Sequence, residues 1–368
     1  MVFWIDNYSS LKNCTQRLAD NKTLCLDTEF IRSHTFYPQL ALVQIYNGEH
    51  CWLIDTPNID DLTPLKRLFE NPECTLIMHA CAEDLEVLRY TAQIHPKKIF
   101  DTQIAASLVN IGYSISYAGL LESLTGIKLT KSVTRSNWLA RPLSEEQIKY
   151  AEDDVAHLER LYKLLCFKLS AYGRWSWFED EISITLENVE ARDSIEFYFE
   201  RLKGKHRLDS RSLTVLKRLS CWREKTARAK NMPRQRIISD AILFKLAANL
   251  PKSYSDLFAI EDLNPREIRV FGNNVISEIQ KSYDDPEVAS IPSLLNNSGN
   301  TLVKRIHQCL TDFGELREIP VEILVSKKEL EVIVRSASSG NIRWPPRLLK
   351  GWRVDIVKPI ISGFFSNS

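Results

Sequence analysis

The hydrophobic pattern of the chain changes at about residue 175, and this change limits the folds that the chain can adopt. Before that point, short apolar runs such as TLCLDTE, LALVQIY, CWLID and CTLIMHA are separated by polar turns and amphipathic segments. After it, apolar residues recur every three or four positions, as in Leu213, Leu216, Leu219 and Trp222. Short β-branched runs predict strands, and a 3.6-residue period predicts helices. LALVQIY and CWLID, separated by the polar turn NGEH, predict a hairpin. We therefore expect an α/β N-terminal domain, with helices flanking a mixed sheet, followed by all-α domains.

Two turn-rich breaks divide the helical half. The stretches KGKHRLDS and SYDDPEVASIP are rich in residues that end helices. With 368 residues and 44% hydrophobic content, the chain is long enough to fill several cores. We predict an α/β domain at 1–170, a helical linker at 171–205, and small helical domains at 206–285 and 290–368.

The sequence carries no signal for a membrane or an oxidising compartment. No apolar run approaches the roughly 20 residues that span a bilayer, and the start, MVFWIDNYSSLKN, lacks the pattern of a secretory signal. The eight cysteines are scattered without C-x-x-C pairs, so neither zinc ligands nor a disulfide framework is indicated. We expect a cytoplasmic protein with no membrane partner.

Charge is strongly segregated although the net charge is only +1. Residues 179–200 hold eight acids and one arginine, whereas residues 201–236 hold thirteen Lys and Arg and two acids. Helix faces that are solvated or paired with each other would explain this pattern, and so would a surface that binds a polyanion. The candidate polyanion contacts in the basic block are Arg218, Arg223, Lys225, Arg228 and Lys230.

Two carboxylates end the first long apolar run. Asp27 and Glu29 lie two residues apart in LCLDTEF, so on a strand they point to the same face with Cα atoms some 6–7 Å apart. Like charges this close are tolerated when a proton is shared or a cation lies between them. A strand end exposed to water is the plain alternative.

A third acid follows another strand. In HACAEDLEVLRY, the helical period places Asp84 beside the apolar stripe, whereas Glu83 and Glu86 are expected to face solvent. We interpret His79 as a hydrogen-bonded histidine at the end of the strand, because no second histidine stands at ligand spacing. Asp84 is therefore the acid of this helix that can reach the first pair.

The fourth acid lies on a helix that LSEEQIKYAEDDVAHLERLYKLL predicts as one long element. Ser144 and Gln147 form a capping box at its start. Tyr150 and Asp154 are four residues apart and share one flank, while Asp153 projects elsewhere. Taken alone, Tyr150 also fits a half-buried packing residue. With Asp27, Glu29 and Asp84, these side chains form an all-oxygen set that suits two Mg²⁺ or Mn²⁺ ions about 3.5–4 Å apart, an arrangement used in phosphodiester displacement.

These motifs resemble those of the DEDD 3′→5′ exonucleases in their tyrosine-containing branch, and more closely the ribonuclease D family. LDTEF is similar to the first family motif, HACAEDLEVL to the second and YAEDDV to the third, and TFYPQLALVQIY, FDTQIAASL and RPLSEEQIKYAEDD extend the likeness over residues 1–170. The resemblance implies a ribonuclease-H-like fold. It also implies that Asp27, Glu29, Asp84 and Asp154 bind two ions and that Tyr150 positions the attacking water.

The helical half extends the resemblance. Residues 207–285, with LKRLSCWREKTARAKNMPR, resemble the helicase-and-ribonuclease-D C-terminal (HRDC) domain, and residues 290–368 resemble a diverged second copy. Asn137 in SNWLARPLS stands where the family leads us to expect Asp, a difference that concerns substrate contacts and none of the four acids.

The activity that this resemblance implies is hydrolysis of RNA from a free 3′ end to 5′-mononucleotides, with tRNA precursors and other small structured RNAs as substrates and no nucleotide cofactor. Two alternatives stay open at this point. Werner-type DNA 3′→5′ exonucleases share the catalytic motifs, and a non-catalytic RNA-binding protein could keep the fold.

Overall fold

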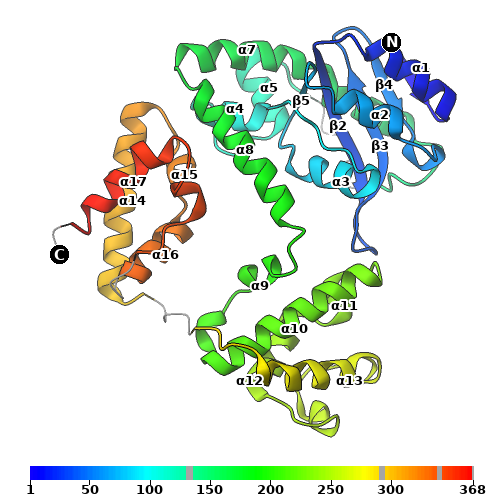
Figure 1. The fold of residues 1–368 in the computed structure, drawn as a ribbon. Coiled ribbons are helices and arrows are strands. Elements are labelled where there is room, and N and C mark those ends of the chain that lie inside the picture. The colour runs from blue at the N-terminus through cyan, green and yellow to red at the C-terminus, as the bar shows by residue number, and fades with distance from the viewer. Residues whose placement is uncertain (130–135, 290–294, 338–341, 367–368) are drawn as a thin grey trace. The chain divides into compact units, whose positions relative to one another are not determined.

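The computed structural model of the protein describes residues 1–129, 136–289, 295–337 and 342–366 (Figure 1). Its contacts divide the chain into two units. The first unit contains Met1–Ile31, Pro38–Glu187 and Leu295–Ser368, and the second contains Arg32–Tyr37 and Asn188–Leu294. No helix in the described ranges is long and apolar enough to cross a membrane.

The first unit is built on a six-stranded mixed sheet, as the sequence predicts. The strand order is β1-β4-β3-β2-β5-β6. The β4–β3 and β3–β2 pairs are antiparallel and the other pairs are parallel, which confirms the predicted hairpin between β3 and β4. The strands are β1 (Val2–Ile5), β2 (Thr23–Ile31), β3 (Gln39–Tyr46), β4 (Cys51–Ile54), β5 (Thr75–Met78) and β6 (Ile99–Asp101).

Strands β1 and β6 were not predicted from the sequence. They have four and three residues and form the two edges of the sheet, each held by a single neighbour. Such short runs show too little alternation to be recognised without the strand that they pair with.

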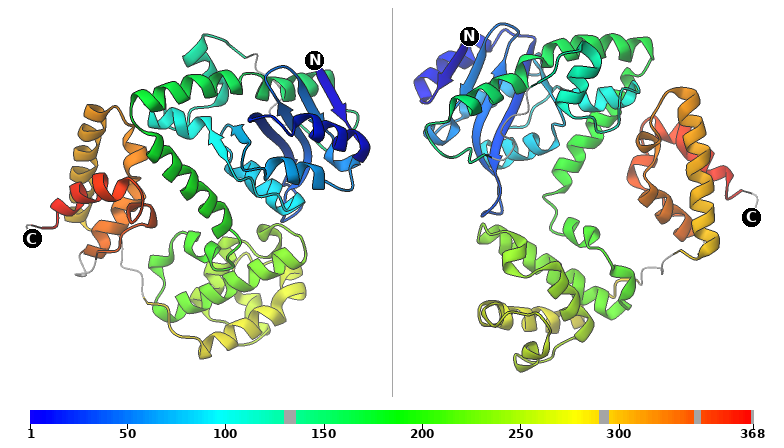
Figure 2. Two further views of the ribbon diagram at one scale, coloured as in Figure 1. Left: turned by 45° about the horizontal axis from the view of Figure 1, so that its top comes forward. Right: turned by 180° about the vertical axis from the view of Figure 1, so that it is seen from behind.

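Helices flank this sheet and complete the first unit. Between the strands and after them lie α1 (Tyr8–Leu18), the 3₁₀ turn η1 (Thr56–Asn58), α2 (Thr63–Phe69), α3 (Ala82–Ala92), α4 (Thr102–Leu108), α5 (Tyr117–Thr125), α6 (Glu145–Ala156), α7 (Leu158–Ala171) and α8 (Trp175–Ala191). The C-terminal part of the unit is a helical bundle of α14 (Asn297–Arg317), α15 (Val321–Leu324), α16 (Lys327–Ala337), η5 (Pro346–Leu348) and α17 (Arg353–Gly363) (Figures 1 and 2).

The predicted long helix after Ser144 is instead two helices, and the capping box at its start is confirmed. The break falls at His157, where a side chain from α5 enters the backbone ladder. The Tyr117 hydroxyl donates to the Asp153 carbonyl at 3.0 Å and accepts from the His157 amide at 3.3 Å. It thus occupies the place of the hydrogen bond from residue 157 to residue 153, and such an insertion is a known cause of a helix kink.

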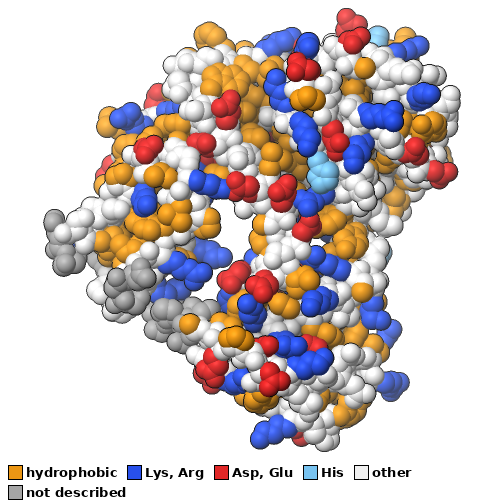
Figure 3. Space-filling view, in the orientation of Figure 1, with side chains coloured by type: hydrophobic (Ala, Val, Ile, Leu, Met, Phe, Trp, Pro, Cys, Tyr) orange, Lys and Arg blue, Asp and Glu red, His pale blue; other side chains and the backbone are white. Residues whose placement is uncertain are grey.

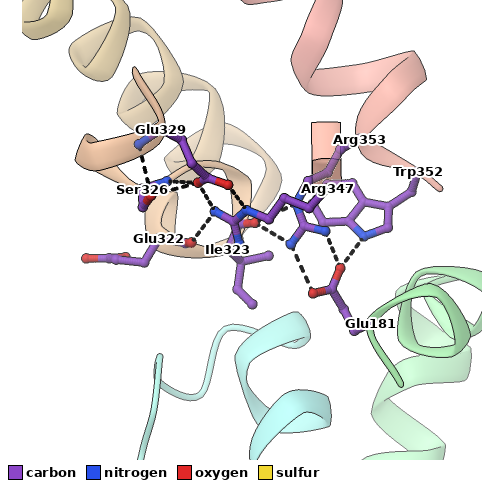
Figure 4. Close-up of polar contacts among 8 residues, drawn as sticks. All are labelled: Glu181, Glu322, Ile323, Ser326, Glu329, Arg347, Trp352 and Arg353. Carbon is purple, nitrogen blue, oxygen red and sulfur yellow. Dashed lines mark hydrogen bonds and ion pairs between the residues drawn. The ribbon is translucent and has the colours of Figure 1, made fainter. Parts of the chain in front are cut away.

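The C-terminal bundle packs against α8, and the described core of the first unit is continuous across this contact. The fully buried guanidinium of Arg353 pairs with Glu181 of α8 and donates to the Ile323 carbonyl from Nε at 3.0 Å and from Nη2 at 2.7 Å (Figure 4). The Trp352 indole donates to the same Glu181 carboxylate at 2.9 Å, and its ring stacks on Trp177 at 4.3 Å. A buried ion pair and an aromatic stack therefore fix the bundle on this helix.

Among the described residues of the second unit, all the regular elements are helices. The unit contains α9 (Phe197–Arg201), η2 (Lys205–Arg207), α10 (Ser210–Ala229), α11 (Arg234–Ile237), α12 (Asp240–Asn249), η3 (Ser255–Ala259), α13 (Pro265–Lys281) and η4 (Ser282–Asp284). The predicted stripe of α10 is largely confirmed, because Leu213, Leu216 and Leu219 are fully buried and Trp222 is partly buried.

Candidate active site

Strand β2 carries the first two acids in a part that is paired with β3 but not with β5. Strand β5 pairs with β2 only over Thr23–Cys25, so the later part of β2 extends beyond that partner. Asp27 and Glu29 lie in this extension, and their alternation with Thr28 directs them to one face. Because β5 does not pair with this part of β2, the helix that follows β5, α3, can bring a side chain next to it.

Asp84 lies in the first turn of α3, which follows β5. It is 7% exposed, and its Oδ1 accepts a hydrogen bond of 2.5 Å from the Thr28 hydroxyl. The turn that leads into α3 is held by Asp101, whose carboxylate accepts from the amides of Ala80 at 3.2 Å and Cys81 at 2.8 Å. Asp101 therefore fixes the start of α3, and Thr28 fixes the carboxylate of Asp84 within its first turn.

The other predictions for this segment had different outcomes. His79 is hydrogen-bonded as predicted, through Nδ1 to Thr102 and through Nε2 to the Ile115 carbonyl. Glu83 is exposed, but the prediction that Glu86 faces solvent is wrong, because that side chain is 5% exposed. The apolar stripe indicates only one packed face, whereas the middle of α3 is buried on every side.

Helix α6 supplies Tyr150 and Asp154. The Tyr150 hydroxyl is hydrogen-bonded to the Asp154 carboxylate, and the tyrosine ring lies 5.9 Å from that of Trp138. Asp153 points elsewhere, as predicted, and forms a 2.8 Å ion pair with Lys149. Adjacent acids on this helix therefore have different surroundings.

Burial and mutual repulsion show that the four acids lie together. Burial raises the pKa of Asp27 well above its usual range, and the charges of Asp84, Asp154 and Glu29 raise it further. Burial, then the charges of Asp154 and Asp84, raise the pKa of Glu29 to about 8. Burial also raises the pKa of Asp84 and that of Asp154 to about 7, against hydrogen bonds from Thr28 and Tyr150 that lower them. The effect of Asp84 and Asp154 on the two acids of β2 requires α3 and α6 to bring their acids close to that strand.

The donor set fits hard divalent cations by its chemistry. Its ligands are carboxylate oxygens, which Mg²⁺ and Mn²⁺ prefer. Among the described residues, no group of three His, Cys, Asp or Glu side chains is already arranged to hold an ion. Carboxylates without a counter-charge repel one another, so they are expected to lie farther apart than the ligands of a bound ion do.

Three residues that shape this site were not predicted from the sequence: Thr28, Asp101 and Tyr117. Thr28 and Asp101 lie within the motifs LDTEF and FDTQIAASL, but nothing in the local sequence shows that they hydrogen-bond to Asp84 and to the turn before it. Asn137, also singled out, is exposed, and its side chain accepts from the Leu139 amide at 3.2 Å.

The structure narrows the set of candidate polyanion contacts. Arg223 is 2% exposed, and its guanidinium donates to the Ile238 carbonyl at 2.9 Å and pairs with Asp240 at 2.7 Å. That arginine therefore holds α10 to the segment before α12 instead of facing solvent, and its inclusion is corrected. The sequence shows its charge but not its burial.

The remaining candidates differ in whether their charge is paired with an acid of the protein. Arg218 pairs with Glu278 and Asp285, and Arg228 pairs with Glu224. Lys225 and Lys230 are exposed, with no ion pair recorded for either in the described part of the chain. On the face of this unit seen in Figure 3, basic side chains are accordingly interspersed with acidic ones.

Comparison with known proteins agrees with this geometry. A family model described as a 3′-5′ exonuclease matches residues 2–170, and the HRDC domain model matches residues 212–279. The ribonuclease D of Pseudomonas paraeruginosa is 37% identical over 356 residues, which cover 96% of this chain and 94% of that protein. The ribonuclease D of Escherichia coli K12 is 31% identical over 342 residues, covering 91% and 90% of the two chains.

A solved structure extends the likeness to three dimensions. The crystal structure of Escherichia coli RNase D, described as an exoribonuclease involved in structured RNA processing, superposes with a TM-score of 0.89 at 29% identity and covers 100% of this chain and 99% of that chain. Sequence identity and fold agree along the full length. The chain therefore belongs to the ribonuclease D family of 3′→5′ exoribonucleases.

Proposed function

We propose that Asp27, Glu29, Asp84 and Asp154 hold two divalent cations, Mg²⁺ or Mn²⁺, at the site where the 3′-terminal phosphodiester of RNA is cleaved. The observation that carries the proposal is the group of one buried and three half-buried acids, in which the charges of Asp84 and Asp154 raise the pKa of both Asp27 and Glu29 beyond the effect of burial. When bound, the cations supply a counter-charge for the phosphate and lower the pKa of the attacking water.

Tyr150 orients the attacking water and does not deprotonate it. Burial, and next the charge of Asp154, raise the pKa of the Tyr150 phenol above its usual range. The phenol is therefore neutral near pH 7 and acts as a hydrogen-bonding group, not as a general base. The Tyr150 hydroxyl donates a hydrogen bond to the Asp154 carboxylate, which fixes the hydroxyl and leaves the phenolic oxygen free to accept a hydrogen bond from water.

The proposed substrate is RNA with a free 3′ end, including tRNA precursors and other small structured RNAs, and the product is a 5′-mononucleotide. The relatives named ribonuclease D support this substrate class. In the second unit, a cavity of about 610 Å³ is lined in part by Lys225 and Trp222, and also by the acids Glu196, Glu278 and Asp285. A lysine and an aromatic ring that line one cavity suit a phosphate and a stacked base.

Two further parts of the proposal concern organisation and location. We assign residues 290–368 as a diverged HRDC-like domain, supported by the helices α14 to α17. We place the protein in the cytoplasm, supported by its eight unpaired cysteines.

The test uses the full chain with RNA and DNA oligonucleotides of equal sequence, labelled at the 5′ end, in Mg²⁺, Mn²⁺ or chelator. A ladder that shortens from the 3′ end of RNA, stops in chelator and is absent with Asp27→Asn is the expected result. Equal or faster shortening of DNA would favour the Werner-type alternative. RNA binding without shortening in either metal would favour the non-catalytic alternative.

A further inference from the structure

Gln44 is a buried amide that the reaction described above does not use. It lies in β3, is 0% exposed, and its Nε2 and Oε1 atoms have no hydrogen-bond partner among the described residues. The strand on either side of it is apolar, with Val43 and Ile45 also fully buried. An unpaired buried amide is unfavourable, so its presence in a core strand calls for a role.

The sheet register places this amide beside an acid of the site. Gln44 is the direct antiparallel partner of Asp27, and opposed residues of such a pair project to the same face. Its partner on the other side is Leu53 of β4, which is apolar. Asp27 is therefore the one polar residue directly opposite Gln44 in the sheet.

This shared face is also the face covered by α6 and α7. Two residues along the same strands, Cys25 and Tyr46 are partners on this face. They pack in one hydrophobic cluster with Ala151 and Val155 of α6 and with residues of α7. Gln44 is thus enclosed between the sheet and these helices, with Asp27 at its side.

We propose that Gln44 is a positioning residue for the cation site: its amide, unpaired in the metal-free chain, donates an N–H to one carboxylate oxygen of Asp27 when cations bind and thereby directs the other oxygen toward them. The inference rests on the function proposed above. An ionised carboxylate only accepts hydrogen bonds, and a glutamine amide supplies two N–H donors. Hydrogen bonds of this kind orient metal ligands and strengthen the site that they support.

If Gln44 orients Asp27, replacing it should have different effects on the stability of the metal-free fold and on the affinity for cations. A purely structural role would not produce this difference. Replacing the amide by an apolar side chain of similar length removes an unpaired buried polar group, so the metal-free fold should be unchanged or more stable. The same change removes the donor that orients Asp27, so cation affinity should fall. A role in packing, or in holding a buried water, would change stability without this loss of affinity.

The experiment compares full-length wild type with Gln44→Met and Gln44→Leu. Thermal melts in chelator report the metal-free fold, and calorimetric titration with Mn²⁺ reports affinity. We expect a melting temperature equal to or above that of wild type, together with Mn²⁺ binding that is about 10- to 100-fold weaker. Mn²⁺ affinity within twofold of wild type would overturn the inference. Failure of both variants to fold without metal would also overturn it, because the amide would then be structural.

Two further variants make the outcome specific. Ser220→Ala removes another buried, unpaired polar atom, from a side chain that is 1% exposed in α10, and should leave Mn²⁺ affinity unchanged. Asp154→Asn tests the proposed cation site itself. If Asp154→Asn binds Mn²⁺ as wild type does, the proposed function fails. If it binds weakly while Gln44→Met binds normally, only the role of Gln44 fails.

Discussion

Asp153 and Asp154 are neighbours in the sequence, but α6 turns their side chains about 100° apart. Asp154 is hydrogen-bonded to Tyr150, and its charge acts on Asp27 and Glu29, whereas Asp153 pairs with Lys149. Asp154→Asn should therefore lower the turnover of a short RNA by about 10³-fold or more, on the order of 4 kcal/mol in the barrier. Asp153→Asn is the matched control and should stay within about twofold, because exposed ion pairs contribute little.

Thermal melts of the same variants in chelator measure the stability of the metal-free fold. The metal-free fold of Asp154→Asn should be at least as stable as that of wild type, because one repelling charge is removed from the group. An inactive Asp153→Asn, or an Asp154→Asn variant that unfolds in chelator, would contradict the assignment of Asp154.

The raised pKa values of the same acids predict how the metal-free protein responds to pH. The pKa of Glu29 is about 8 in the folded chain, and ordinary glutamate has a pKa of 4.5. Between these values the folded state binds more protons than the unfolded state, so stability falls as pH rises from about 4 to about 8. Glu29→Gln removes this carboxyl and should therefore remove the part of the pH-dependent loss of stability that the carboxyl causes. In chelator, the melting temperature of Glu29→Gln relative to wild type should increase from pH 5 to pH 8, and a constant or decreasing difference would contradict the raised pKa.

At the scale of elements, α8 joins the sheet part of the first unit to the C-terminal bundle through Glu181 and Arg353. Glu181→Gln leaves the guanidinium of Arg353 buried without its counter-charge, and such a loss costs about 3–5 kcal/mol. Glu187→Gln, on the same helix, removes only a partly exposed pair with Lys350 and should cost under about 1 kcal/mol. Urea denaturation of both variants measures the difference.

Limited proteolysis shows where the stability is lost. Cleavage within α14 to α17 should become faster in Glu181→Gln than in Glu187→Gln, because the bundle depends on the buried pair. Equal stability of the two variants would show that the apolar contacts alone hold the bundle.

For the whole molecule, the prediction concerns RNA affinity. Lys225 is exposed within the basic block and lines the cavity beside Trp222, whereas Lys252 is exposed outside the block. Lys225→Glu should weaken RNA binding and reduce the slope of log affinity against log salt by about 0.7 for each lost phosphate contact. Lys252→Glu makes the same change in net charge and should have a smaller effect. Equal losses in binding titrations at several salt concentrations would attribute affinity to net charge and not to this surface.

The sequence by itself determined those features that depend on local periodicity. Asp27 and Glu29 share a face because strand side chains alternate, and Tyr150 and Asp154 share a flank because they are four apart on a helix. The hairpin of β3 and β4 and the mixed sheet followed in the same way from short apolar runs and the polar turns between them.

Only the tertiary structure decided the features that depend on contacts between distant segments. The hydroxyl of Tyr117 breaks the predicted long helix at His157, and the neighbours of Glu86 and Arg223 bury charges that local patterns place in solvent. Likewise, the position of Gln44 opposite Asp27 is set by strand register. A one-residue slip in register would turn that amide to the other face, and register is fixed by the packing of the whole sheet.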